Sequence, residues 1–137
     1  MKRHATTHLP RYLLALLALY CAASLIHFAH NAEFVSAYPN LPASLTRTKV
    51  YLAWLAITAV GATGIVAFRL GLRLPGLLLI AAYAALGFAG LDHYWVAAMS
   101  AHTFAMNATI WFEVTAAGVL FVTTIALLLR STATKPA

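Results

Sequence analysis

Four long apolar runs constrain the fold of this chain more than any other feature. They cover approximately residues 12–31, 50–68, 75–94 and 106–129 of the 137. Each has about the 20 residues that a helix needs to cross about 30 Å of hydrocarbon. A segment in lipid must satisfy its own backbone, so each run is predicted to be a helix. The sequence therefore predicts a single all-α domain over residues 1–137, an integral membrane four-helix bundle.

The composition agrees with a membrane protein and excludes several soluble classes. Hydrophobic residues make up 63% of the chain and charged residues 9%, against roughly 45–50% and about 25% in soluble domains. This balance excludes a cytosolic enzyme and a disordered tail. The net charge is +6, but the basic residues form no stripe that would follow phosphates, so we expect no nucleic-acid partner. Cys21 is the only cysteine, which excludes an internal disulfide and dithiol redox chemistry.

Basic residues near the ends of the runs predict the orientation. The side that carries both termini holds seven of them: Lys2, Arg3, Arg11, Arg69, Arg73, Arg130 and Lys135. The other side holds two, Arg47 and Lys49. The positive-inside rule then places both termini in the cytoplasm, in a bacterial inner membrane by our interpretation. The first run is long for a signal peptide, and Tyr20 is large for the position before a lipoprotein Cys21, so we expect an uncleaved helix.

Aromatic residues are expected to mark the two membrane boundaries in this topology, as they do in other membrane proteins. Tyr12 lies at the inner boundary. The outer boundary is predicted to hold six aromatic side chains: Tyr38, Tyr51, Trp54, Tyr94, Trp95 and Trp111.

Ionisable side chains are distributed unevenly between the two halves of the predicted bundle. The outer half holds all three acidic residues and four of the six histidines. They are Glu33, Asp92, Glu113, His27, His30, His93 and His102. An ionisable group within a membrane segment is costly and is by default a functional hypothesis. We therefore predict one polar site near the outer membrane surface, built from three helices and facing the periplasm.

Helical periodicity supports the convergence of these groups, because residues three or four apart share a helix face. In the first run, one face carries Tyr20, Ser24, His27 and Asn31. In the last, the same spacing relates His102, Met106, Thr109 and Glu113. The second run has no acidic residue or histidine. It offers only Thr58 and Thr63 with Gly61 and Gly64, which predicts a packing helix that forms a wall of the site.

The residue types favour a metal ion. His27 and His30 stand one turn apart, a spacing that suits two ligands of one ion. Imidazole and carboxylate without thiolate suit Zn, Fe, Mn or Cu. The predicted ligands are His27, His30, His93, His102, Glu113 and Asp92. Haem between two histidines ranks behind an ionic metal, because the surrounding carboxylates are unusual for a haem pocket.

Three further polar residues are expected to support the ligands. Glu33 lies three residues after His30 and could orient its imidazole, although a solvated carboxylate at the interface fits the same position. Asn31 and Asn107 are assigned the same supporting role.

These observations predict a metal-binding pocket in the outer leaflet. The protein is then either a membrane metalloenzyme acting on a lipid-soluble substrate or a metal-handling accessory subunit. In the enzyme, Glu113 or Asp92 serves as general base on a bound water. One alternative is a metal-free membrane enzyme in which Glu113 and a histidine carry out acid–base chemistry on a lipid. Another is a structural subunit of a larger membrane complex, with a membrane-protein partner or a second copy of the chain.

Overall fold

The computed structural model describes residues 8–133, and all regular secondary structure in that range is helical. Four helices are long and apolar enough to cross a membrane: Arg11–Glu33, Arg47–Arg69, Arg73–Val96 and Phe104–Ser131. The elements in chain order are α1 (Arg11–Glu33), η1 (Val35–Ala37), α2 (Arg47–Arg69), α3 (Arg73–Leu86), η2 (Gly87–Asp92), α4 (His93–Val96), η3 (Met99–Ala101) and α5 (Phe104–Ala133). The predicted all-α architecture is therefore confirmed for the part of the chain that is described.

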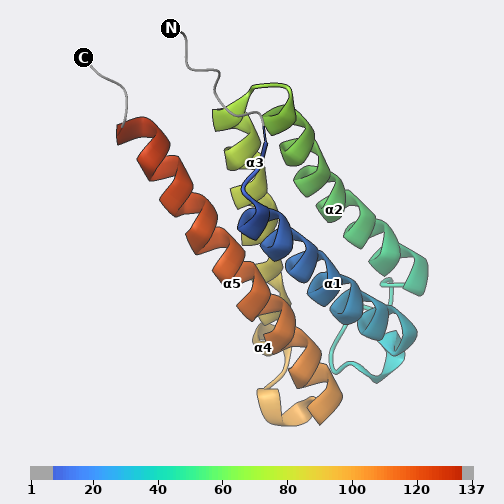
Figure 1. The fold of residues 1–137 in the computed structure, drawn as a ribbon. Coiled ribbons are helices and arrows are strands. Elements are labelled where there is room, and N and C mark those ends of the chain that lie inside the picture. Colours follow the sequence, from blue (N-terminus) through green and yellow to red (C-terminus); the bar gives the residue numbers. More distant parts are fainter. Residues whose placement is uncertain (1–7, 134–137) are drawn as a thin grey trace, which may run out of the picture.

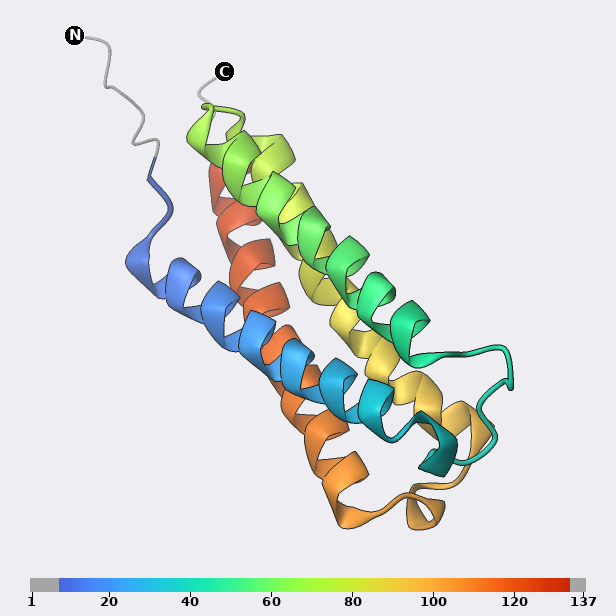
Figure 2. The same ribbon diagram turned by 90° about the vertical axis from the view of Figure 1, so that its right-hand side faces the viewer.

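The long helices form an up-and-down bundle in which α1 packs on α5 and α2, and α3 packs on α2 and α5 (Figures 1 and 2). The α2–α3 turn and the C-terminal end of α5 lie at one end of the bundle (Figure 1). The α1–α2 connection with η1, and the α3–α5 connection with α4 and η3, lie at the other end (Figure 1). Gly71 closes the α2–α3 turn with a φ of 86°, a left-handed conformation that favours glycine directly after a helix.

The core lies between α1, α3 and α5, and its fully buried side chains include Leu13, Tyr20, Ile80 and Leu120. Helix α2 is attached to the outside of this core through close backbone contact with α3. A Cβ added at Gly76 would lie 2.7 Å from the backbone nitrogen of Phe68 and 2.9 Å from the carbonyl oxygen of Gly64. Small residues allow helices to approach this closely, as they do in membrane bundles.

The third span is not one uniform helix, which differs from the regular helical phase expected from the sequence. After Leu86 the chain winds as the six-residue 3₁₀ helix η2 before α4 begins. Gly87 is packed so tightly that a Cβ there would lie 2.6 Å from Ala117 Cβ and 2.7 Å from Tyr20 Oη. A 3₁₀ helix turns about 20° more per residue than an α-helix, or about 120° over this segment. As a result His93 is buried and Asp92 is exposed.

Candidate functional site

A buried histidine and a buried glutamate face each other across the bundle at the end that carries η1 and η3. His27 on α1 is 2% exposed and Glu113 on α5 is 1% exposed. His27 Nε2 lies 3.7 Å from Glu113 Oε2. This separation is longer than a hydrogen bond, and the two groups form an ion pair only when the histidine holds the proton and the glutamate does not. Among the described residues, it is the closest approach of two oppositely ionising groups inside the bundle.

Thr109 fixes the tautomer and orientation of His27. Thr109 Oγ1 donates its only hydrogen to the carbonyl oxygen of Met106 at 3.0 Å. His27 Nδ1 lies 3.3 Å from the same Oγ1, so the threonine oxygen accepts a hydrogen bond from Nδ1–H. In the neutral ring the lone pair then resides on Nε2, the atom that faces Glu113. In this tautomer the imidazole can accept a proton from, or return one to, the neighbouring carboxyl group once the two atoms approach to hydrogen-bond distance.

A cavity of about 150 Å³ lies beside this pair. Its polar wall consists of His27, Asn31, His93 and Glu113, and its apolar wall includes Phe28 and Leu86. Within the described part of the chain, Glu113 Oε2 and Asn31 Oδ1 are buried without a hydrogen-bond partner. Buried polar atoms left unpaired cost about 1–3 kcal/mol each. Such atoms on a cavity wall favour a site that receives a polar group.

Gly90 of η2 lies beside the carboxylate of Glu113 and has no side chain that would come between it and the cavity. A Cβ at this position would lie 3.3 Å from Glu113 Oε2. That is tighter than ordinary van der Waals contact, so a larger residue would cover the oxygen. The 3₁₀ helix η2 thus places a glycine, without a side chain, next to the Glu113 carboxylate.

A second layer of rings packs behind the pair. His93 is 5.4 Å from His27 between ring centroids, and its Nε2 lies 3.2 Å from Asn31 Nδ2. Tyr38 packs against His93 at 4.9 Å between centroids, and its hydroxyl lies 2.9 Å from His30 Nδ1. The sequence predicts Tyr38 at the lipid boundary, but the η1 loop folds inward and buries it. Burial raises the pKa of Tyr38 to about 12.

His102 closes the outer side of this layer. It follows η3 and precedes α5, and its ring lies 6.0 Å from that of His93. His102 Nδ1 lies 3.0 Å from the carbonyl oxygen of Ala98, which holds the ring against the loop. Asn107 braces the same loop, because its amide donates to the carbonyls of Met99 and His102 and its oxygen accepts from Tyr94.

Five residues assigned to the site by sequence do not line the cavity: His102 and Asn107, described above, and Asp92, His30 and Glu33. Asp92 is exposed and contributes instead to a separate surface cavity with His93 and Leu41. His30 is partly buried and contacts Tyr38 rather than Glu113. Glu33 forms an exposed ion pair with Arg47 at 2.7 Å and accepts from the hydroxyl of Tyr51, so its carboxylate is engaged away from the His30 ring.

The six predicted metal ligands therefore do not form one cluster. Across residues 8–133, no group of three or more His, Cys, Asp or Glu side chains is arranged to hold a metal ion. The structure brings His27, His93 and Glu113 to one cavity, but their contacts are pairwise and are completed by Thr109 and Asn31.

Two contributors to the site, Thr109 and Tyr38, are not among the site residues predicted from the sequence. Thr109 shares the helix face of Glu113 at a spacing of four residues, and that spacing is the available signal. Tyr38 has no such signal, since its position depends on the path of the loop between α1 and α2.

Comparisons with protein-family models, with curated proteins and with solved structures give no match to this chain.

Proposed function

We propose that the protein is an integral membrane protein with both termini in the cytoplasm and its polar cavity in the periplasmic half of a bacterial inner membrane. The support is the position of the arginines. Arg11 begins α1, Arg69 ends α2, Arg73 begins α3 and Arg130 lies in the last turn of α5. These positions belong to the same end of the bundle (Figure 1), opposite to the cavity, as the positive-inside rule requires.

Reporter fusions test this orientation. A reporter joined after Ala137 should be active only in the cytoplasm, and one inserted near Asn40 should be active only outside it. Asn40 lies in the loop that follows η1, at the cavity end. The opposite pattern would overturn the periplasmic placement of the cavity.

We further propose that the cavity carries out metal-free acid–base chemistry on a lipid-soluble substrate. The observation that carries this proposal is the buried contact of His27 Nε2 with Glu113 Oε2 on the wall of a cavity. Intramembrane carboxylates are expensive and are retained chiefly for function. A positioned acid and base contribute about 10²–10⁴-fold to the rate of a proton transfer.

In the proposed reaction the His27–Glu113 pair shares one transferable proton. One member removes a proton from the substrate and the other returns a proton at a second position. The pair is restored by proton transfer between Glu113 Oε2 and His27 Nε2, which face each other at 3.7 Å and come to hydrogen-bond distance for this step. Electrons shift only within the substrate, so the step is an isomerisation or a proton exchange and needs no co-reactant.

Incorporation of deuterium tests the reaction on all membrane lipids at once. Purified protein in nanodiscs made from total bacterial lipid extract is incubated in heavy water, and the lipids are returned to ordinary water before mass spectrometry. Only deuterium on carbon survives this wash. We expect one lipid-soluble species to gain deuterium with the wild-type protein and to lose the gain with Glu113→Gln. Asp92→Asn is the matched control, because Asp92 is exposed and lies outside the cavity.

Elemental analysis of the same preparation separates this proposal from its competitors. Stoichiometric Zn, Fe, Mn or Cu that is lost in Glu113→Gln would replace acid–base chemistry by the metal site expected from the residue types. Absence of deuterium incorporation together with loss of folding in Glu113→Gln would favour a structural subunit.

A further inference from the structure

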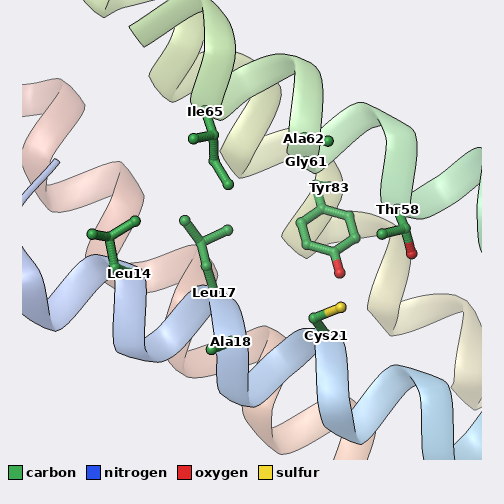
Figure 3. Close-up of a pocket in the computed structure, with 9 residues that line it drawn as sticks. All are labelled: Leu14, Leu17, Ala18, Cys21, Thr58, Gly61, Ala62, Ile65 and Tyr83. Atoms are coloured by element: carbon green, nitrogen blue, oxygen red, sulfur yellow. The ribbon is translucent and has the colours of Figure 1, made fainter. Parts of the chain in front are cut away.

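A second cavity lies between α1, α2 and α3, away from the ionisable pair. It has a volume of about 270 Å³, close to the lower limit of known small-molecule pockets. Leu14, Leu17 and Ile65 form one end of it, and Cys21, Thr58 and Tyr83 gather at the other (Figure 3). We call this space the α1–α2 crevice.

The polar end of the crevice carries hydroxyl groups that lack partners. Tyr83 is 2% exposed, and its hydroxyl points toward the thiol of Cys21 (Figure 3). In the part of the chain that is described, Tyr83 Oη and Thr58 Oγ1 are buried with no hydrogen-bond partner. A buried hydroxyl without a hydrogen-bond partner costs about 1–3 kcal/mol of stability. Both groups therefore favour a ligand that forms hydrogen bonds with them.

The Tyr83 ring is held in place from two sides, so its hydroxyl has a defined direction. Its ring centroid lies 4.6 Å from that of Tyr20, and Tyr20 Oη donates to the carbonyl oxygen of Tyr83 at 3.2 Å. On the other side the ring lies against Gly61, where a Cβ would be 2.5 Å from Tyr83 Cδ1. The fixed ring holds its hydroxyl at the polar end of the crevice, next to the thiol of Cys21 (Figure 3).

The chemistry of the walls selects the ligand. The crevice residues among those described include no charged side chain, which disfavours ions and fatty-acid carboxylates. Tyr83, Thr58 and Cys21 each offer a hydrogen, and a carbonyl oxygen accepts two such hydrogen bonds. We infer that the α1–α2 crevice binds an uncharged, lipid-soluble molecule through a carbonyl group at one end, with its apolar tail against Leu14, Leu17 and Ile65.

The ligand enters from the lipid side. Leu14, Ala18 and Ala62 line the crevice and are exposed on the surface of the bundle between α1 and α2. This inference uses the membrane placement proposed above but not the acid–base pair, because His27 and Glu113 line the other cavity.

Alkylation of Cys21 provides a direct test, because this residue lines the crevice and is the only cysteine of the chain. The rate of its reaction with N-ethylmaleimide is measured by mass spectrometry on protein in nanodiscs. Methyl heptyl ketone is the probe, and nonane is the control because it has a similar shape but no carbonyl. We expect the ketone, at about four times its Kd, to slow alkylation about five-fold. Nonane at the same concentration should slow it by less than about two-fold.

Infrared spectroscopy of the bound ketone tests the role of the hydroxyl groups. Its carbonyl band should shift to lower frequency in the wild-type protein, and both the shift and the protection of Cys21 should be lost in Tyr83→Phe. Thr58→Val should weaken both, and Glu113→Gln should leave both unchanged even if it abolishes deuterium incorporation. Equal protection by ketone and nonane, or an unshifted band in the folded wild-type protein, would overturn the inference.

Discussion

The two cavities use neighbouring faces of α1 and differ in the chemistry that they bury. The cavity beside α5 places two ionisable groups, His27 and Glu113, almost completely out of solvent. The α1–α2 crevice has only neutral hydroxyl and thiol groups, and part of its lining is exposed on the bundle surface. The buried acid and the buried imidazoles therefore lie in the cavity beside α5, while the crevice beside the peripheral α2 has no carboxylate and no imidazole. This division follows from the cost of an ionisable group next to lipid.

Helical spacing explains how one helix serves both cavities. His27 and Asn31 are four residues apart and face α5 and η2. Leu14, Leu17 and Cys21 follow a different set of three- and four-residue steps and face α2. The two sets are about a quarter turn apart at about 100° per residue. Substitutions in one cavity should therefore leave the other intact.

The largest effect is expected for Glu113→Gln. The amide keeps the shape of the side chain but cannot accept or return the proton, so deuterium incorporation should fall about 100- to 10,000-fold. Protection of Cys21 by the ketone should not change. Mass spectrometry measures both in the same preparation. A fall in both would show that the two cavities are not independent.

Gly76→Ala should affect the α1–α2 crevice and spare the acid–base cavity. The new methyl group would lie 2.7 Å from the backbone nitrogen of Phe68, and backbone atoms cannot rotate away. Overpacking of this kind costs about 1–3 kcal/mol, which thermal unfolding in detergent measures. Because α2 walls the crevice and not the acid–base cavity, Cys21 alkylation should change while deuterium incorporation persists.

Gly118→Ala is the control for this substitution. The closest atom to its added Cβ is Phe88 Cε1 at 3.8 Å, an ordinary contact. Its unfolding temperature should be unchanged or slightly higher, since alanine favours a helix by about 1 kcal/mol over glycine. Equal destabilisation by the two substitutions would contradict the close α2–α3 contact.

Tyr38 makes the stability of the protein depend on pH in the alkaline range. Burial raises its pKa to about 12 from the usual 10.0, so its neutral form is favoured in the folded protein. Its contribution to stability is complete below pH 10, falls as the unfolded chain ionises first, and is lost by about pH 12. Tyr38→Phe should flatten the loss of thermal stability across this window. An unchanged alkaline profile in the variant would show that Tyr38 is not the group responsible.

The smallest effect is expected at the exposed ion pair of Glu33 and Arg47. The side chains are 42% and 65% exposed, and such pairs contribute about 0–1 kcal/mol. Arg47→Ala should lower stability by no more than this amount, and added salt should remove the difference. A larger loss, or a change in deuterium incorporation, would restore Glu33 to the functional site.

The sequence by itself determined the four apolar helices, because length and hydropathy require no knowledge of the partners of a helix. It also identified Glu113 and His27 as candidates, since both stand on helix faces with a three- and four-residue repeat. These conclusions depend only on local periodicity.

Only the tertiary structure decided which candidates meet. The η2 segment turns His93 inward and leaves Asp92 exposed. Regular helical phase cannot anticipate a 3₁₀ winding that accompanies the packing of Gly87 against Ala117. The loop after α1 carries Tyr38 into the bundle. The α1–α2 crevice combines side chains from three separate helices. Such juxtapositions depend on how helices pack against one another, a property of the whole chain that no single segment contains.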